Sequence, residues 1–153
     1  MNTKHEDANL ILKLYDLRRE ETMRKAREWF FTEFNPTSVQ DILDVIMGDK
    51  SAYLRMLTTY WDMAASFVNN GAIDEKMFDD ANGEHVSVFA RLEPFLGEMR
   101  EKFGSPRILQ HLEQLVLRLP DAKERTTAVR ERFKQMTAMR AETAATASAG
   151  QQR

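Results

Sequence analysis

Residues 53–68 read YLRMLTTYWDMAASFV, a stretch rich in large apolar side chains and poor in charge. Its apolar residues recur every three or four positions, which is the spacing of one face of an α-helix. They form two stripes that are offset by one residue and therefore lie about 100° apart around the helix axis. The stripes are Leu54, Leu57, Trp61, Ala64, Val68 and Tyr53, Met56, Tyr60, Met63, Phe67. Because this apolar arc is so wide, we expect residues 50–70 to form a central helix, the most buried one.

The helical spacing continues on both sides of this segment, and no strand or hairpin signal interrupts it. Asp74 and Ser105 are expected N-caps, and Pro106 favours the start of a helix. The first helix carries a charged interruption at residues 18–21. The sequence predicts an all-α, single-domain helical bundle of five longer and two short helices. The expected ranges are 6–34, 37–47, 50–70, 74–81, 84–103, 105–119 and 121–140.

The length of 153 residues suits one domain. We expect that domain to span residues 1–140. Residues 141–153, AETAATASAGQQR, are small and polar, so they are predicted to be a disordered tail. The chain shows neither a signal-peptide pattern nor an apolar run long enough for a membrane helix, and we expect a cytoplasmic protein without membrane contact.

Catalytic and cofactor motifs are missing from the sequence. It contains no cysteine, which excludes disulfides, Cys-based zinc sites and thiol catalysis. Phosphate-binding glycine loops, H-E-x-x-H and G-x-S-x-G are absent too. A calcium-loop pattern fails because Phe78 and Phe89 occupy positions that need carboxylates. His85 and His111 are interpreted as packing residues, with an acid/base or metal role as the alternative. We expect no enzyme activity, no cofactor and no metal.

Charge is distributed unevenly along the chain, although the net charge is only −2. Residues 33–103 carry six basic and thirteen acidic groups, a net charge of −7, whereas residues 104–153 carry nine basic and five acidic groups, a net charge of +4. We interpret the basic last helix as a solvated face attracted to the acidic middle. The alternative is an anionic partner, nucleic acid in particular, bound through residues 123–140 with Arg130, Arg132 and Lys134 as its contacts.

A short apolar stripe at Leu10, Leu14 and Leu17 is separated from the later core residues by the charged run at residues 18–21. Such a stripe needs a cover, and a second copy of the chain is the simplest one. We therefore expect a non-catalytic protein–protein interaction module that associates with itself.

Residues 53–78, YLRMLTTYWDMAASFVNNGAIDEKMF, contain a turn at Asn70–Gly71 that leads into a helix begun by Asp74. Together with Trp29–Phe30–Phe31 and with residues 93–106, EPFLGEMREKFGSP, this stretch resembles a bacterial family of small helical proteins known only as a domain of unknown function. The resemblance spans roughly residues 10–118. It implies a helical fold and brings no catalytic residue. Many family members look to have an N-terminal membrane helix, which this sequence does not show.

Overall fold

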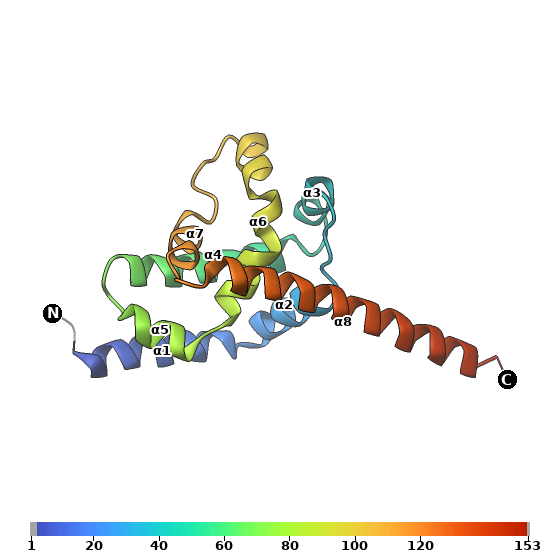
Figure 1. Ribbon diagram of the computed structural model, residues 1–153, viewed down its shortest axis with the longest axis horizontal. Helices are drawn as coiled ribbons and strands as arrows, with labels where there is room; N and C mark the ends of the chain where they lie inside the picture. The colour runs from blue at the N-terminus through green and yellow to red at the C-terminus, as the bar shows by residue number, and fades with distance from the viewer. Residues whose placement is uncertain (1–2, 153) are drawn as a thin grey trace.

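The computed structural model describes residues 3–152, and this part of the chain contains helices and no strand (Figure 1). The all-α prediction is therefore confirmed, with eight helices rather than seven. They are α1 Lys4–Arg18, α2 Glu21–Thr32, α3 Val39–Met47, α4 Ser51–Asn69, α5 Glu75–Ala81, α6 Glu84–Phe103, α7 Gln110–Leu117 and α8 Ala122–Gly150. Residues 1–2 and 153, which belong to the predicted domain and tail, lie outside the described residues.

The additional helix arises because the predicted helix over residues 6–34 breaks at Arg19 and Glu20. The Glu20 carboxylate accepts hydrogen bonds from the backbone N–H groups of Thr22 and Met23, both at 3.0 Å, which lowers its pKa. A side-chain acceptor at this position satisfies donors that lack a partner inside the helix, so α2 begins here. The charged run that interrupts the apolar stripe thus marks a helix boundary.

α4 lies in the centre of the molecule and packs against α2, α3, α5 and α7. Its first stripe, which includes Leu57 and Trp61, is entirely buried. The second stripe is buried at Tyr60, but Met63 and Phe67 remain 39% exposed. The prediction that this helix is the most buried one is wrong, since α6 has nine buried residues and α4 seven. α6 passes through the core between α3, α7 and α8.

The predicted helix start at Ser105–Pro106 is also wrong, because α7 begins at Gln110. Residues 106–109 form turns, and Leu109 has a left-handed backbone with φ of 53°. The guanidinium of Arg100 donates two hydrogen bonds to the Ile108 carbonyl oxygen, at 3.1 and 2.8 Å. This contact holds the segment as a loop against α6.

α8 crosses the molecule and projects beyond the other helices at its C-terminal end (Figure 1). The helix continues past Ala141, the predicted start of the disordered tail, to Gly150. All of residues 141–150 are exposed, so tertiary packing does not stabilise them. Their alanine content accounts for the helix, because alanine has the highest intrinsic helix propensity.

Candidate functional site

A groove of about 620 Å³ lies between α6, α8 and residues 35–37. Its lining is mainly apolar, with Pro36, Pro94, Phe95, Phe133 and Ala138 among its residues. Three basic residues, Arg91, Arg130 and Lys134, share this lining. Cavities of a few hundred Å³ with apolar walls and a few polar groups are the usual form of small-molecule sites.

Arg91 lies at the floor of this groove and is only 8% exposed. One of its terminal nitrogens, Nη2, donates to the Phe34 carbonyl oxygen and to Asn35 Oδ1, the latter at 3.2 Å. The other, Nη1, is buried and has no hydrogen-bond partner within residues 3–152. No carboxylate of the described chain forms an ion pair with Arg91. Burial lowers the pKa of the guanidinium to about 10, so the group is cationic at neutral pH.

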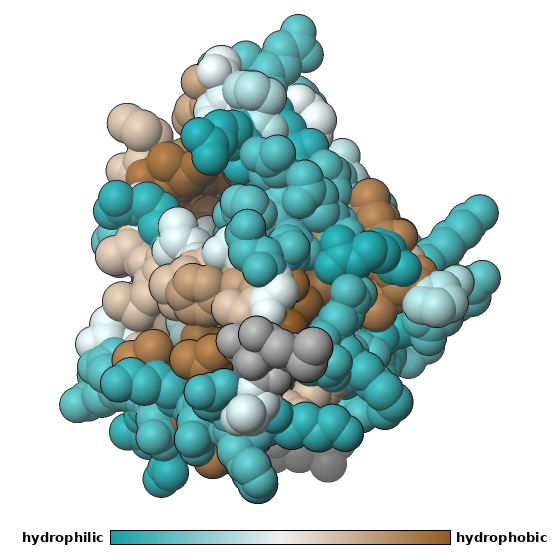
Figure 2. Space-filling model, turned by 90° about the vertical axis from the view of Figure 1, so that its left-hand side faces the viewer, coloured by the Kyte–Doolittle hydropathy of each residue, from teal (hydrophilic) through white to brown (hydrophobic). Residues whose placement is uncertain are grey.

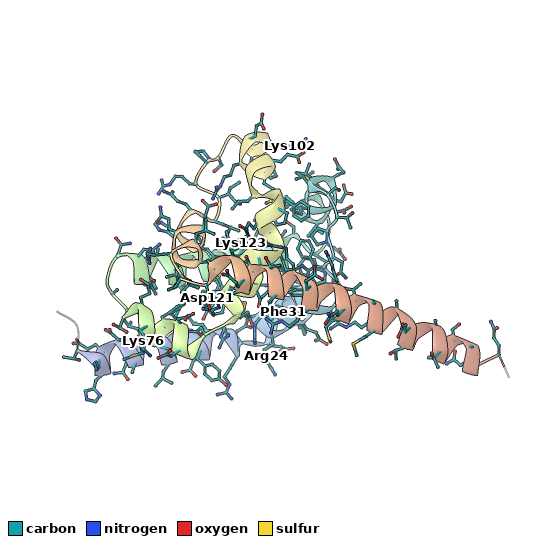
Figure 3. The ribbon with its side chains drawn as sticks, viewed as in Figure 1. Arg24, Phe31, Lys76, Lys102, Asp121 and Lys123 are labelled. Atoms are coloured by element: carbon teal, nitrogen blue, oxygen red, sulfur yellow. The ribbon has the colours of Figure 1, made fainter. Side chains whose placement is uncertain are left out.

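Aromatic rings enclose the Arg91 guanidinium. Its central carbon lies 3.8 Å from the centroid of the Phe133 ring and about 6 Å from those of Phe30 and Phe34. The Phe133 ring in turn stacks on Phe31, which α2 presents to α8, with 5.6 Å between centroids (Figure 3). Cation–π contacts offset part of the cost of burying the charge, but they leave the Nη1 donor without an acceptor.

The three predicted basic residues of α8 do not form one surface. Arg130 donates to the Ala90 carbonyl oxygen at 3.2 Å and forms an ion pair with Glu93 at 2.9 Å. Lys134 lies on the same groove and pairs with exposed Glu131 at 3.3 Å. Arg132 lines a separate hollow beside Phe31 and Met136 and makes no ion pair within the described residues. Arg130 and Lys134 are therefore brought together and Arg132 is not.

The predicted leucine stripe is divided as well. Leu14 is 6% exposed and belongs to the core, and its carbonyl oxygen accepts a hydrogen bond from the Tyr60 hydroxyl. Leu10 and Leu17, at 40% and 48% exposure, lie on the surface. Leu14 faces the core because α1 lies along the body of the molecule rather than projecting from it.

A partly buried polar cluster that the sequence did not reveal joins four helices. Glu84 of α6 accepts two hydrogen bonds from the Arg27 Nε and one from its Nη2, at 2.7–3.0 Å, and a further one from Trp61 Nε1 at 3.1 Å. Arg18 of α1 lies 3.9 Å from the same carboxylate. These partners are separated by 23 to 66 positions in the chain, so no local pattern indicates them. Because the carboxylate is already saturated with donors, we interpret the cluster as a structural cross-link.

The two histidines of interest occupy different surroundings. His85 is 1% exposed between the rings of Trp61 and Phe78, and its Nδ1 has no partner within the described residues. His111 is partly buried on α7, and its carbonyl oxygen accepts from Asn69. In the described range no three His, Asp or Glu side chains are placed to hold a metal ion.

No helix within residues 3–152 has the length and apolar character needed to cross a lipid bilayer. No curated protein and no solved structure gives a significant match to the chain. The family model described as Domain of unknown function (DUF4760) matches residues 3–119, which include α1 to α7 and leave α8 outside the match. The resemblance noted in residues 10–118 is thereby confirmed, and the chain belongs to the DUF4760 family.

Proposed function

We propose that the protein is a non-catalytic interaction module that associates with a second copy of itself through one face of α1 and the C-terminal half of α4. The observation that carries the proposal is a group of exposed apolar side chains on these two helices. They are Leu10 and Leu17 of α1 and Met63 and Phe67 of α4, each 39–48% exposed. Exposed apolar groups that gather on one face are typical of protein–protein contacts.

Two hydrogen bonds link α1 to α4 and to the start of α5, and they support the proposal that these side chains share a face. The Tyr60 hydroxyl donates to the Leu14 carbonyl oxygen, and Asp7 accepts from the Asp74 backbone N–H at 3.0 Å. α1 and α4 run in opposite directions (Figure 1). Along the chain, Leu10 lies between the bonded residues Asp7 and Leu14, and Phe67 lies between their partners Tyr60 and Asp74. Figure 2 shows hydrophobic residues gathered on the left-hand part of the surface at this end of the molecule.

The charges that flank Leu10 favour a second copy as the partner. Glu6 and Lys13 are exposed and lie on the same side of α1 as Leu10, at four and three residues from it. If two α1 helices pack antiparallel about Leu10, each Glu6 lies beside Lys13 of the second copy. This pairing is isologous, as a two-fold dimer requires, and opposite charges at its edge stabilise the register.

The test is the mass in solution, measured by sedimentation over a micromolar concentration range. We expect the wild-type chain to dimerise and the double variant Leu10→Glu, Leu17→Glu to be monomeric with unchanged helicity. Leu12→Glu is the matched control, because Leu12 is 60% exposed but lies about 200° around α1 from Leu10. A wild-type chain that stays monomeric at high micromolar concentration, or a Leu12 variant that also dissociates, contradicts the proposal.

A further inference from the structure

We propose that the groove between α6 and α8 binds an anionic amphiphile, a ligand with one acidic headgroup and one acyl chain, and that Arg91 recognises the acid. This inference concerns a different face from the proposed dimer contact and does not depend on it. Three features of the described residues carry it: a buried cation without an acid, an unused donor on that cation, and apolar walls beside it.

The first feature is the charge of Arg91. A buried guanidinium is ordinarily neutralised by a carboxylate, because an isolated charge is costly away from water. The neighbouring basic residue shows this pattern, since Arg130 pairs with Glu93 at 2.9 Å. Arg91 is more buried than Arg130, and within residues 3–152 its only hydrogen-bond acceptors are a carbonyl oxygen and an amide oxygen. An acid supplied by a ligand completes this site.

The second feature is the geometry of the unused donor. Arg91 Nη2 is bound to Phe34 and Asn35, whereas Nη1 has no partner within the described residues. Arginine binds carboxylates and phosphates through such N–H groups with short, charge-assisted hydrogen bonds. Nη1 is covered by the protein, and the ring that lies against the guanidinium is that of partly exposed Phe133. Rotation of the Phe133 ring away from the guanidinium and toward solvent opens the donor to an acid that enters from the groove.

The third feature is the composition of the walls. Pro36, Pro94, Phe95 and Ala138 line the same groove as Arg91, and its volume of about 620 Å³ accommodates a medium-length acyl chain. Lys134 at the rim is exposed and its only acid partner in the described chain is exposed Glu131. A cation at the rim draws an anionic headgroup toward the groove. Apolar walls with a cationic floor thus match the two halves of an amphiphile.

The test compares ligands by calorimetric titration below their micelle concentrations. Dodecanoate and dodecyl phosphate carry both halves of the proposed ligand. The one that binds with the higher affinity identifies the preferred headgroup, carboxylate or phosphate. Dodecanol lacks the acid, and acetate and inorganic phosphate lack the chain. We expect saturable binding of at least one acid with a chain, and at least about tenfold weaker binding of the three controls.

Variants then assign the binding to the groove. Arg91→Met keeps the bulk of the side chain and removes the charge, and we expect it to weaken binding at least about tenfold. Lys102→Met is the matched control, because exposed Lys102 lies at the end of α6 remote from α8 (Figure 3). Ala138→Trp fills the groove from an exposed position of α8 and serves if Arg91→Met does not fold.

The outcomes separate this inference from the proposed dimer. Loss of binding in Arg91→Met and Ala138→Trp, with normal binding in Lys102→Met and in the Leu10, Leu17 double variant, supports it. Absence of binding by the wild-type chain, equal affinity for dodecanol, or unchanged affinity in Arg91→Met or Ala138→Trp overturns it.

Discussion

His85 is a titratable side chain held in apolar surroundings. Burial lowers its pKa to about 4; the negative charge of Asp79 opposes this shift, and the positive charges of Arg125 and Arg18 add to it. Between pH 6.5 and 4, His85 therefore binds a proton in the unfolded chain but not in the folded chain. Since the unfolded state binds more protons in this window, the free energy of unfolding rises with pH and falls on acidification.

We therefore predict that His85 alone removes up to about 3 kcal/mol of stability between about pH 6.5 and pH 4. The measurement is urea-induced unfolding at several pH values, for the wild-type chain and for His85→Leu. The difference between the two chains isolates the histidine from the carboxylates that titrate in the same range. Parallel pH profiles for the two chains contradict the prediction.

Trp61 stabilises the fold in two ways, since its side chain is fully buried and its Nε1–H donates to Glu84 at 3.1 Å. We predict that Trp61→Ala lowers the free energy of unfolding by about 3–5 kcal/mol, as for other large-to-small changes in a core. Met139→Ala, at a position 60% exposed on α8, is the control and changes it by less than about 0.5 kcal/mol. Denaturant unfolding measures both, and a cost below about 1 kcal/mol for Trp61→Ala places this residue outside the core.

At the residue scale, burial can be predicted from the sequence wherever helical periodicity determines it. The stripe of Leu54, Leu57 and Trp61 is buried as its spacing indicates, because one helix face has one environment. Periodicity does not report partners from distant segments. The Arg91 guanidinium packs against the ring of Phe133, which is 42 positions away in the chain. The Glu84 carboxylate is held by Arg27, which is also distant in the chain.

The helices themselves are predicted best where a boundary has a local chemical cause. Ser38 and Asp74 accept backbone hydrogen bonds at the starts of α3 and α5, as their residue types indicate. The start of α7 is not evident from the sequence, because a tertiary contact from Arg100 to Ile108 holds the preceding loop. The break before α2 is not evident either, because glutamate is not among the preferred N-cap residues.

Two glycines, one inside α6 and one directly after it, give predictions of opposite sign. Gly104 ends the helix with φ of 60°, and Gly97 lies inside the helix with open space where a Cβ would stand. Alanine at position 104 is strained in the left-handed region, so Gly104→Ala is expected to cost about 1–2 kcal/mol. Gly97→Ala is expected to stabilise by about 0.5–1 kcal/mol, because it lowers the entropy of the unfolded chain. Thermal and denaturant unfolding measure both changes; a loss of stability in Gly97→Ala contradicts the helix geometry.

At the scale of the whole molecule, the acidic middle neutralises part of the positive charge of the C-terminal region. Arg118 pairs with Glu75 at 3.1 Å, Arg125 with Asp79 at 2.9 Å and Arg130 with Glu93 at 2.9 Å. Each pair links α5 or α6 to the C-terminal segment that begins at α7. The uneven charge of the sequence therefore serves in part to hold α8 on the body, as the solvated-face interpretation requires.

This pairing leads to a prediction for nucleic acid, the alternative partner of residues 123–140. Of the basic residues in α8, Lys123, Arg132 and Arg140 make no ion pair in the described chain, and they are too few to bind a duplex tightly at physiological salt. In a fluorescence anisotropy assay near physiological salt, we expect no micromolar binding of a DNA duplex of about 20 base pairs. We expect the triple variant Arg130→Gln, Arg132→Gln, Lys134→Gln to show the same absence of binding. If the helix does bind DNA, the affinity falls with salt by a log–log slope of roughly −0.9 per phosphate, and the triple variant flattens that slope by up to about three units. Such a result would show that basic side chains of α8 leave their acidic partners in the chain to bind DNA. Nucleic-acid binding would then replace self-association as the leading function.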